Sequence, residues 1–319
     1  MKHFYLYLIG LCIISAVVYH TLAAAGEKNE EAAMDQQTAY QIVSDEFNVM
    51  IYAHNKQLLL YKQAKNSYKP YVKELLTPAG INVLLDSPED HKHHHGLMFA
   101  CRVNGINFWE ETKQSGYEVS EDYREVLTTD EEGRFIVRIN WMDARKKQTV
   151  LSEIRTITAA SLPAHEVNLF TWQSIFTVPP SKSEATLSGA HYNGLGMRFR
   201  RSMDKDGQFI TAGNKEGEVF RGEERLTDDD WCAYYSQADG HKVTIAMFNA
   251  PGNPRSPATW FTMKEPFAYL SATMRLHEEP FTLESDEPLT LTYGIALWDG
   301  HTEQGKIQKV FEDWIQKIK

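Results

Sequence analysis

Cysteine is scarce in this chain of 319 residues, which contains only three. Cys12 lies in an apolar N-terminal run, so Cys101 and Cys232 are the two that remain for the rest of the chain. Two cysteines are too few for a disulfide-built scaffold or for a zinc site made of thiolates. They leave two alternatives open, a single Cys101–Cys232 disulfide or two buried thiols.

A concentrated basic patch is also lacking. The chain has 33 Lys and Arg residues against 43 Asp and Glu residues, a formal net charge of −10, and its densest basic stretch is the short "ARKK" at Ala144–Lys147. Affinity for nucleic acid comes largely from neutralising phosphates with clustered Lys and Arg. We therefore expect no nucleic-acid partner.

Long apolar runs are absent except at the N-terminus. Phe4–Val18 is apolar, follows a basic residue, and precedes Ala23 and Ala25, which form an A-x-A cleavage site. This order is typical of a secretory signal peptide, and the run is short for a bilayer span of about 20 residues. The interpretation is a signal peptide at 1–25, a flexible polar leader at 26–37 and a single domain at 38–319. It predicts a secreted or periplasmic protein with no membrane span after cleavage.

Most of the remaining sequence alternates as strands do. In Thr149–Ala159, Leu151, Glu153, Arg155 and Ile157 share one face, and we expect the two charged residues to pair at the surface. Similar β-branched and aromatic runs are separated at short intervals by Gly, Pro and Asn, which favours a sandwich. Apolar residues at helical spacing predict a helix at the C-terminus that covers a sheet edge or an open end: Ile307, Val310, Phe311, Trp314, Ile315 and Ile318. The predicted fold class is all-β, a large antiparallel β-sandwich with a C-terminal covering helix.

A cluster of histidines occupies the stretch "DHKHHHGLMFACRVNGINFWEE", from Asp90 to Glu111. Turn residues precede it, so the histidines belong to a loop or to the first residues of a strand. On a straight strand each residue advances about 3.3 Å, so only a near pair such as His93 and His95 could chelate one metal directly. A hydrated loop, acid–base chemistry and a divalent metal held by His91, His93 or His95 all stay open; no other cofactor is indicated.

Two later stretches also combine polar and aromatic groups. "SGAHYNGLGMRFRR" places His191 and Tyr192 at a turn, with Arg198 on the following strand. "FNAPGNPRSPATWF" is a proline-stiffened loop that presents Asn253, Arg255 and Trp260, groups suited to the polar edges and apolar face of a sugar. A plain hairpin and a rigid structural loop are the alternatives.

Together the three stretches resemble a bacterial family that carries the label PmoA. Its members have a DH-x-HH-x-GL…VNG-x-DFW block, a Y-x-GLG-x-R block and a DHP-x-NPR-x-P-x-W block, in this order. The resemblance implies a fold similar to the large sandwiches of galactose mutarotases and a link to carbohydrate metabolism. Its label suggests methane oxidation, which the lack of multiple apolar spans argues against. The chain departs from the family at Asn107, at Asn249 and Ala250, and at His95, where members usually have Asp, Asp-His and Arg.

The resulting hypothesis is a carbohydrate-processing enzyme that acts on a glycoside or a modified sugar by His and carboxylate acid–base chemistry, with a metal as an option. The alternative is a non-catalytic carbohydrate-binding protein. Predicted catalytic residues are His93, His94, His191, Glu110 and Glu111, with Glu153 as a further candidate carboxylate. Predicted substrate-binding residues are Asp90, Trp109, Tyr192, Arg198, Asn253, Arg255 and Trp260.

Overall fold

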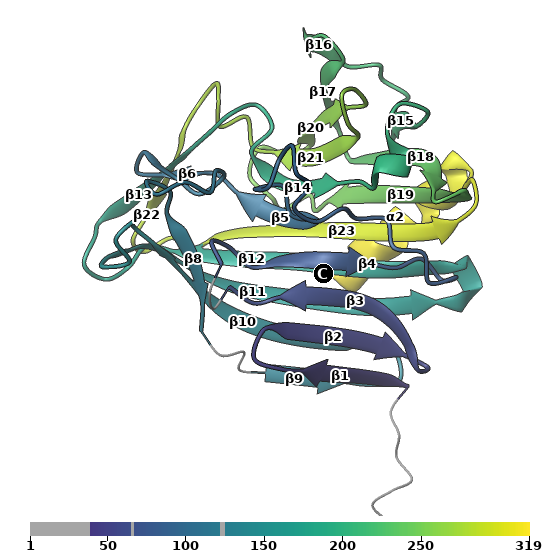
Figure 1. The fold of residues 1–319 in the computed structure, drawn as a ribbon, viewed down its shortest axis with the longest axis horizontal. Coiled ribbons are helices and arrows are strands. Elements are labelled where there is room, and N and C mark those ends of the chain that lie inside the picture. Colours follow the sequence, from purple (N-terminus) through teal and green to yellow (C-terminus); the bar gives the residue numbers. More distant parts are fainter. Residues whose placement is uncertain (1–38, 65–66, 122–124) are drawn as a thin grey trace, which may run out of the picture. The chain divides into compact units, whose positions relative to one another are not determined.

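Two large antiparallel sheets dominate the described part of the chain (Figure 1). The computed structural model describes residues 39–64, 67–121 and 125–319. The predicted signal peptide and leader therefore lie outside the described residues. Within those residues, no helix combines the length and apolar character needed to cross a bilayer.

The strands pair as follows in the described residues. The ten-stranded sheet has the order β1 (Tyr40–Ser44), β2 (Asn48–Ala53), β3 (Lys56–Lys62), β4 (Tyr71–Leu75), β5 (Leu97–Ala100), β14 (Gly194–Arg198), β21 (Tyr269–Thr273), β20 (Ala258–Met263), β17 (Glu224–Asp229) and β16 (Glu218–Arg221). The nine-stranded sheet has the order β15 (Gln208–Thr211), β18 (Trp231–Ala238), β19 (His241–Asn249), β23 (Leu289–Asp299), β12 (Val167–Thr177), β11 (Thr149–Leu162), β10 (Gly133–Met142) and β8 (Tyr117–Ser120), with β9 (Glu125–Thr128) paired to β10.

A smaller four-stranded sheet lies at one end of the sandwich, on the left of Figure 1. Its order is β22 (Phe281–Glu284), β13 (Glu184–Ser188), β6 (Arg102–Val103) and β7 (Ile106–Asn107). Two short 3-10 helices, Pro163–His165 and Arg201–Met203, complete the connections described.

The main core lies between the two large sheets. It combines Phe99 and Leu270 from the ten-stranded sheet with Trp172 and Ile295 from the nine-stranded sheet, all almost fully buried. Because side chains alternate along a strand, the central strands β5, β14, β20 and β21 give this core only one of their faces. The predicted antiparallel sandwich is confirmed.

Both cysteines of the described residues are buried in this core. Cys101 and Cys232 are buried free thiols, and burial raises the pKa of each. Of the two alternatives open in the sequence, the structure has the buried thiols.

The C-terminal helix α2 (Gln304–Lys317) follows the predicted apolar spacing, but its position differs from the prediction. It buries Ile307, Val310 and Trp314 against the outer face of the nine-stranded sheet, where they meet Val167 and Phe248. It does not cover an edge or an open end. The outer face of these central strands is itself apolar, so the helix is needed to keep that face from water.

Glu153 and Arg155 pair as predicted, but inside the core rather than at the surface. Arg155 is fully buried, and its Nε and Nη2 donate to the two carboxylate oxygens of Glu153 at 2.8 and 2.9 Å. Glu118 is buried 3.6 Å from the same guanidinium, and burial raises its pKa well above the usual range. The prediction was wrong about burial because alternation identifies a shared face and not which face points inward.

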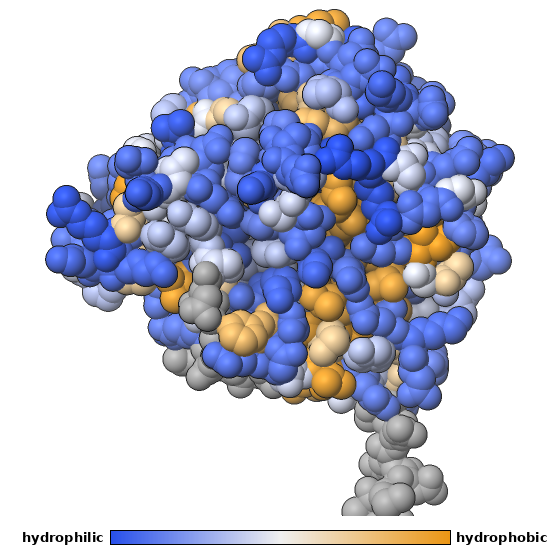
Figure 2. All heavy atoms as spheres, in the orientation of Figure 1, coloured by the Kyte–Doolittle hydropathy of each residue, from blue (hydrophilic) through white to orange (hydrophobic). Residues whose placement is uncertain are grey.

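The outer surface is mainly hydrophilic on the face shown in Figure 2. Among the described residues, Val219 and Phe220 on β16 are exposed large hydrophobic side chains. Figure 1 places β16 at the top, where Figure 2 also shows an apolar patch.

Replacing Arg155 by Gln should destabilise the fold strongly. The substitution leaves the Glu153 carboxylate buried without its cation, a defect that costs about 3–5 kcal/mol. The control Arg138→Gln changes the same residue type on β10, where the side chain is 44% exposed, and should cost less than about 1 kcal/mol. Denaturant unfolding monitored by tryptophan fluorescence measures both; equal losses would contradict this account.

Candidate active site

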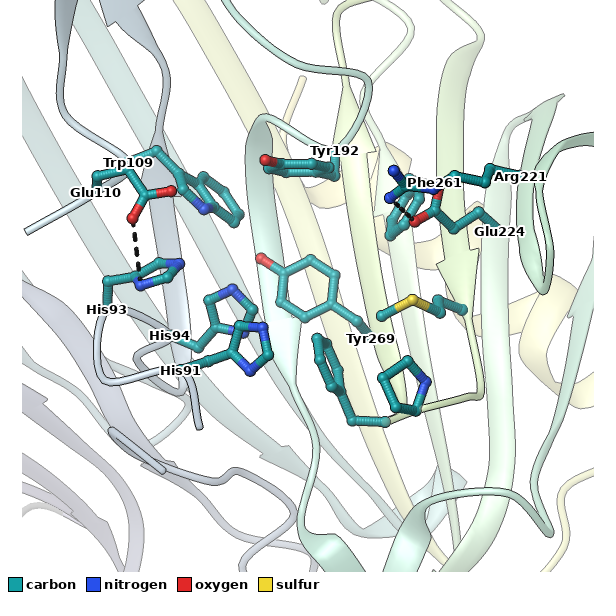
Figure 3. Close-up of a pocket in the computed structure, with 13 residues that line it drawn as sticks. His91, His93, His94, Trp109, Glu110, Tyr192, Arg221, Glu224, Phe261 and Tyr269 are labelled. Carbon is teal, nitrogen blue, oxygen red and sulfur yellow. Dashed lines mark hydrogen bonds and ion pairs between the residues drawn. The ribbon is translucent and has the colours of Figure 1, made fainter. Parts of the chain in front are cut away.

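A cavity of about 350 Å³ lies on the outer face of the ten-stranded sheet, the face turned away from the core. Its apolar wall comes from a separate buried cluster that includes Trp109, Phe261, Phe267 and Tyr269. On β20 and β21, Phe261 and Tyr269 line the cavity, whereas their sequence neighbours Trp260 and Leu270 belong to the core. Figure 3 shows the Tyr269 ring between two polar ends of the cavity.

The histidine cluster occupies a loop, as predicted, and reaches the cavity with three of its four side chains. His91, His93 and His94 line the cavity, whereas His95 does not. His94 is 7% exposed and lies against Trp109 and Tyr269, with ring centroids 5.8 and 5.6 Å away. Burial lowers the pKa of His94 to about 2, and neighbouring basic groups add to this effect. The His94 imidazole is therefore neutral near pH 7.

Unused hydrogen-bonding capacity lies beside this ring. Nδ1 of His94 and the hydroxyl of Tyr269 are both buried and have no hydrogen-bond partner among the described residues. A buried polar atom without a partner is costly, so such atoms mark places where a ligand or water completes the bonding.

His95 anchors the loop instead of lining the cavity. Its Nδ1 lies 2.8 Å from Asp86 Oδ1, and its Nε2 lies 2.8 Å from Glu111 Oε1. Burial lowers the pKa of His95, but the hydrogen bonds to the two carboxylates outweigh it, so the net shift is upward. Nζ of Lys69 joins Glu111 at 3.1 Å and donates to the Trp109 carbonyl at 2.9 Å. Glu111 is thus a structural partner of His95, outside the cavity lining.

Glu110 and Trp109 are positioned by a neighbouring side-chain cap. The Oδ1 atom of Asn107 accepts the backbone N–H groups of Trp109 at 2.8 Å and of Glu110 at 3.2 Å. Glu110 Oε2 then lies 3.4 Å from His93 Nδ1 (Figure 3). Burial lowers the pKa of His93, and the Glu110 carboxylate only partly offsets this. A neutral His93 beside a carboxylate is suited to accept a proton.

The opposite end of the cavity presents a second carboxylate, Glu224. It is 7% exposed and lines the cavity together with Arg221, which donates to it at 2.6 Å (Figure 3). His191 holds the other carboxylate oxygen at 3.0 Å and stacks on Phe220. His191 therefore reaches the site through Glu224. Tyr192 lines the cavity directly, with its ring 5.0 Å from Trp109.

Asp90 and Arg198 support the cavity from outside its lining. Asp90 accepts from Arg201 at 3.0 Å and lies 3.1 Å from His91 Nδ1. The buried guanidinium of Arg198 lies 4.0 Å from the centroid of the Phe267 ring and donates to the Ala268 carbonyl. Both act on side chains that line the cavity.

The polar residues of the third predicted stretch, Phe248–Phe261, do not line the cavity. Asn253 binds Asn249 and Thr292 inside its own loop. Arg255 donates to the carbonyls of Met274, Glu279 and Pro280. Trp260 is fully buried in the main core. These three predicted substrate contacts have structural roles, and Phe261, one position later, supplies the ring that faces the cavity.

No group of three or more His, Cys, Asp or Glu side chains in the described residues is arranged to hold a metal ion. His95 lies between two carboxylates, which removes it from the suggested set of His91, His93 and His95. His91 and His93 remain neighbours, with ring centroids 5.9 Å apart. The described residues therefore do not form a metal centre by themselves.

Several cavity residues had no distinct sequence signal. Arg221 and Glu224 lie in a charged stretch, "FRGEER", that is typical of a solvated turn. Met263 and Tyr269 lie in the strand pair β20–β21, and Pro266 and Phe267 lie in the turn that joins these strands. The "GLG" motif did carry information: a Cβ on Gly196 would collide with the ring and hydroxyl of Tyr269.

A family of unknown function, DUF6807, has a family model that matches residues 48–312. The chain belongs to this family. No curated protein sequence matches it.

Three of the solved structures that match this chain at low identity are the following. The GH36 α-galactosidase AgaA of Geobacillus stearothermophilus has a TM-score of 0.45 and 9% identity, covering 82% of this chain and 41% of its own. A galactose mutarotase-like protein of Lactobacillus casei has a TM-score of 0.43 and 10% identity. The match covers 81% of this chain and 99% of the Lactobacillus protein. A putative aldose 1-epimerase of Klebsiella pneumoniae has a TM-score of 0.40 and 10% identity. The match covers 88% of this chain and 86% of the Klebsiella protein. This chain thus spans less than half of the galactosidase.

The adjacent residues His94 and His95 should give opposite pH effects on stability. The pKa of His94 is lower in the folded than in the unfolded protein, so its contribution falls as the pH drops below about 6.5, by roughly 2 kcal/mol at pH 5. The pKa of His95 is raised, so its contribution is present below about pH 6.5 and is lost as the pH rises through the folded value. His94→Gln should flatten the acid loss, and His95→Gln should steepen it. Urea unfolding between pH 5 and 8 measures both slopes, and equal slopes in the two variants would refute the assignment.

Gly196→Ala should displace Tyr269 from the cavity wall. The added methyl group meets a packed ring, and such overpacking costs about 1–3 kcal/mol. Gly252→Ala is the control, because a Cβ there has no heavy atom within 4 Å. Thermal unfolding of both variants compares them; unchanged stability of Gly196→Ala would show that the ring is not held there.

Proposed function

We propose that the protein is a carbohydrate-processing enzyme that acts on a glycoside or modified sugar through acid–base chemistry in this cavity. The observation that carries the proposal is the arrangement of His93 with Glu110 at one end and Glu224 at the other, separated by aromatic rings (Figure 3).

The aromatic wall supports a sugar ligand. A pyranose has an apolar face of C–H groups, which packs on aromatic rings, and a polar rim of hydroxyls, which needs donors and acceptors. Trp109, Tyr192 and Tyr269 supply the rings, and the unpaired atoms of His94 and Tyr269 supply bonding capacity.

The two ends support proton transfer. Neutral His93 is suited to take a proton from a hydroxyl or a ring carbon, with Glu110 beside it to stabilise the imidazolium that forms. Glu224 is held in one orientation by His191 and Arg221, which suits a group that must meet the substrate in a fixed geometry. A purely binding cavity would not need titrating groups at both ends.

The sequence pattern of residues 1–25 supports a secreted or periplasmic location. Glycosides and their oxidised forms outside the cytoplasm are therefore the substrates we propose.

The test is a panel of glycosides and oxidised sugars, with binding measured by calorimetry and turnover by NMR. His93→Asn should reduce turnover by about 100-fold or more while binding changes little, because the base is lost and the shape is kept. Trp109→Ala should weaken binding of every ligand about tenfold or more, because the stacking surface is lost. His241→Asn is the matched control, because His241 is exposed on β19 and lies outside the cavity lining. It should change neither turnover nor binding.

Binding without turnover by the wild-type protein would favour the non-catalytic carbohydrate-binding alternative. If no sugar of the panel binds, the proposed function is wrong.

A further inference from the structure

A second cavity of about 290 Å³ adjoins the first and shares Trp109, Glu110 and Tyr192 with it. Its remaining lining comes from β6, β7 and the turn at residues 189–193. Because the two cavities have a common wall, a ligand longer than one sugar ring could occupy both by crossing over Glu110 and Tyr192, which are only partly buried.

The polar groups peculiar to this second cavity are hydrogen-bond donors. Arg102 is exposed, and no ion pair or hydrogen bond ties its guanidinium to the described residues. Asn107 uses its Oδ1 to cap Trp109 and Glu110, which leaves its amide nitrogen as the group that can donate to a ligand. Asn193 adds a third donor.

Asn193 is the decisive residue, because it is 3% exposed and yet incompletely bonded. Its Oδ1 accepts the Ala190 backbone N–H at 2.9 Å, which fixes the orientation of the amide. Gly189 permits this packing, since a Cβ there would collide with the Asn193 side chain. The Nδ2 atom is left buried without a partner among the described residues, beside the cavity that Asn193 lines.

We propose that this second cavity is a subsite for an acidic sugar, so that the substrate is a glycoside with a hexuronate unit next to the unit in the first cavity. This inference rests on the proposed function. Three donors, one of them cationic, match the acceptor-only chemistry of a carboxylate, and the planar guanidinium can bind both of its oxygens. Glu110 disfavours an anion at the shared wall, so the acidic group belongs at the Arg102 side.

The test compares two ligands that differ in one group. The first ligand is a disaccharide of one hexuronate and one neutral hexose, used in both orders of the two units. The second is the same disaccharide after reduction of its carboxyl group to an alcohol. Calorimetry should show that the wild-type protein binds an acidic disaccharide about tenfold more tightly than its reduced form. This preference should shrink in about 1 M salt, where the screening length is about 3 Å.

Arg102→Gln should abolish the preference, because the affinity for the acidic disaccharide falls much further than the affinity for the reduced one. Arg145→Gln removes the same charge from an exposed loop outside both cavities and should keep the preference. As a second readout, the side-chain amide signals of Asn193, assigned by their loss in Asn193→Ala, should shift with the acidic disaccharide more than with the reduced one.

The outcomes separate the two proposals. If Trp109→Ala weakens both disaccharides but the wild-type protein shows no preference, or if Arg102→Gln keeps the preference, the acidic subsite is wrong and the proposed function stands. If neither disaccharide nor any panel sugar binds the wild-type protein, both are wrong.

Discussion

The site depends on one buried ion-pair network. His95 lies between Asp86 and Glu111, and Lys69 connects Glu111 to the backbone carbonyl of Trp109. These contacts tie the histidine loop to the segment that carries Trp109 and Glu110. A loop without regular hydrogen bonding would otherwise sample many conformations at an entropic cost. The network therefore holds this loop against the sheet, as strand pairing holds neighbouring strands together.

The ten-stranded sheet serves two purposes with its two faces. Leu270 and Trp260 point into the main core, whereas Tyr269 and Phe261 form the wall of the cavity. Period-two alternation makes this division strict, because neighbouring residues must point in opposite directions. Gly196 contributes to the cavity wall through its lack of a side chain. Because it has no Cβ, the Tyr269 ring can lie against β14.

The sequence predicted the fold well because strand alternation is a local property. Leu151, Glu153, Arg155 and Ile157 do share one face, and the helix residues fall where the period places them. Six of the 13 residues that line the candidate cavity are predicted site residues from stretches that the sequence singles out by their composition: His91, His93, His94, Trp109, Glu110 and Tyr192.

The rest required three-dimensional information. Trp260 was assigned to the ligand and Phe261 was not, because alternation gives two faces without saying which one meets the core. Asn253 and Arg255 were misjudged because polar groups in a rigid loop bind their own backbone as readily as a ligand. Arg221 and Glu224 reach the cavity only through the pairing of β16 with β17 at the far edge of the sheet, a long-range fact that no short motif encodes.

The separation of the two sheet faces has a consequence for how this protein could change over time. Outward-facing positions of β20 and β21 pack in a cluster separate from the main core, so a change of side chain there leaves the packing between the two sheets in place. A lineage of such chains could alter the wall of this cavity at alternate positions of two strands, while the intervening positions preserve the architecture.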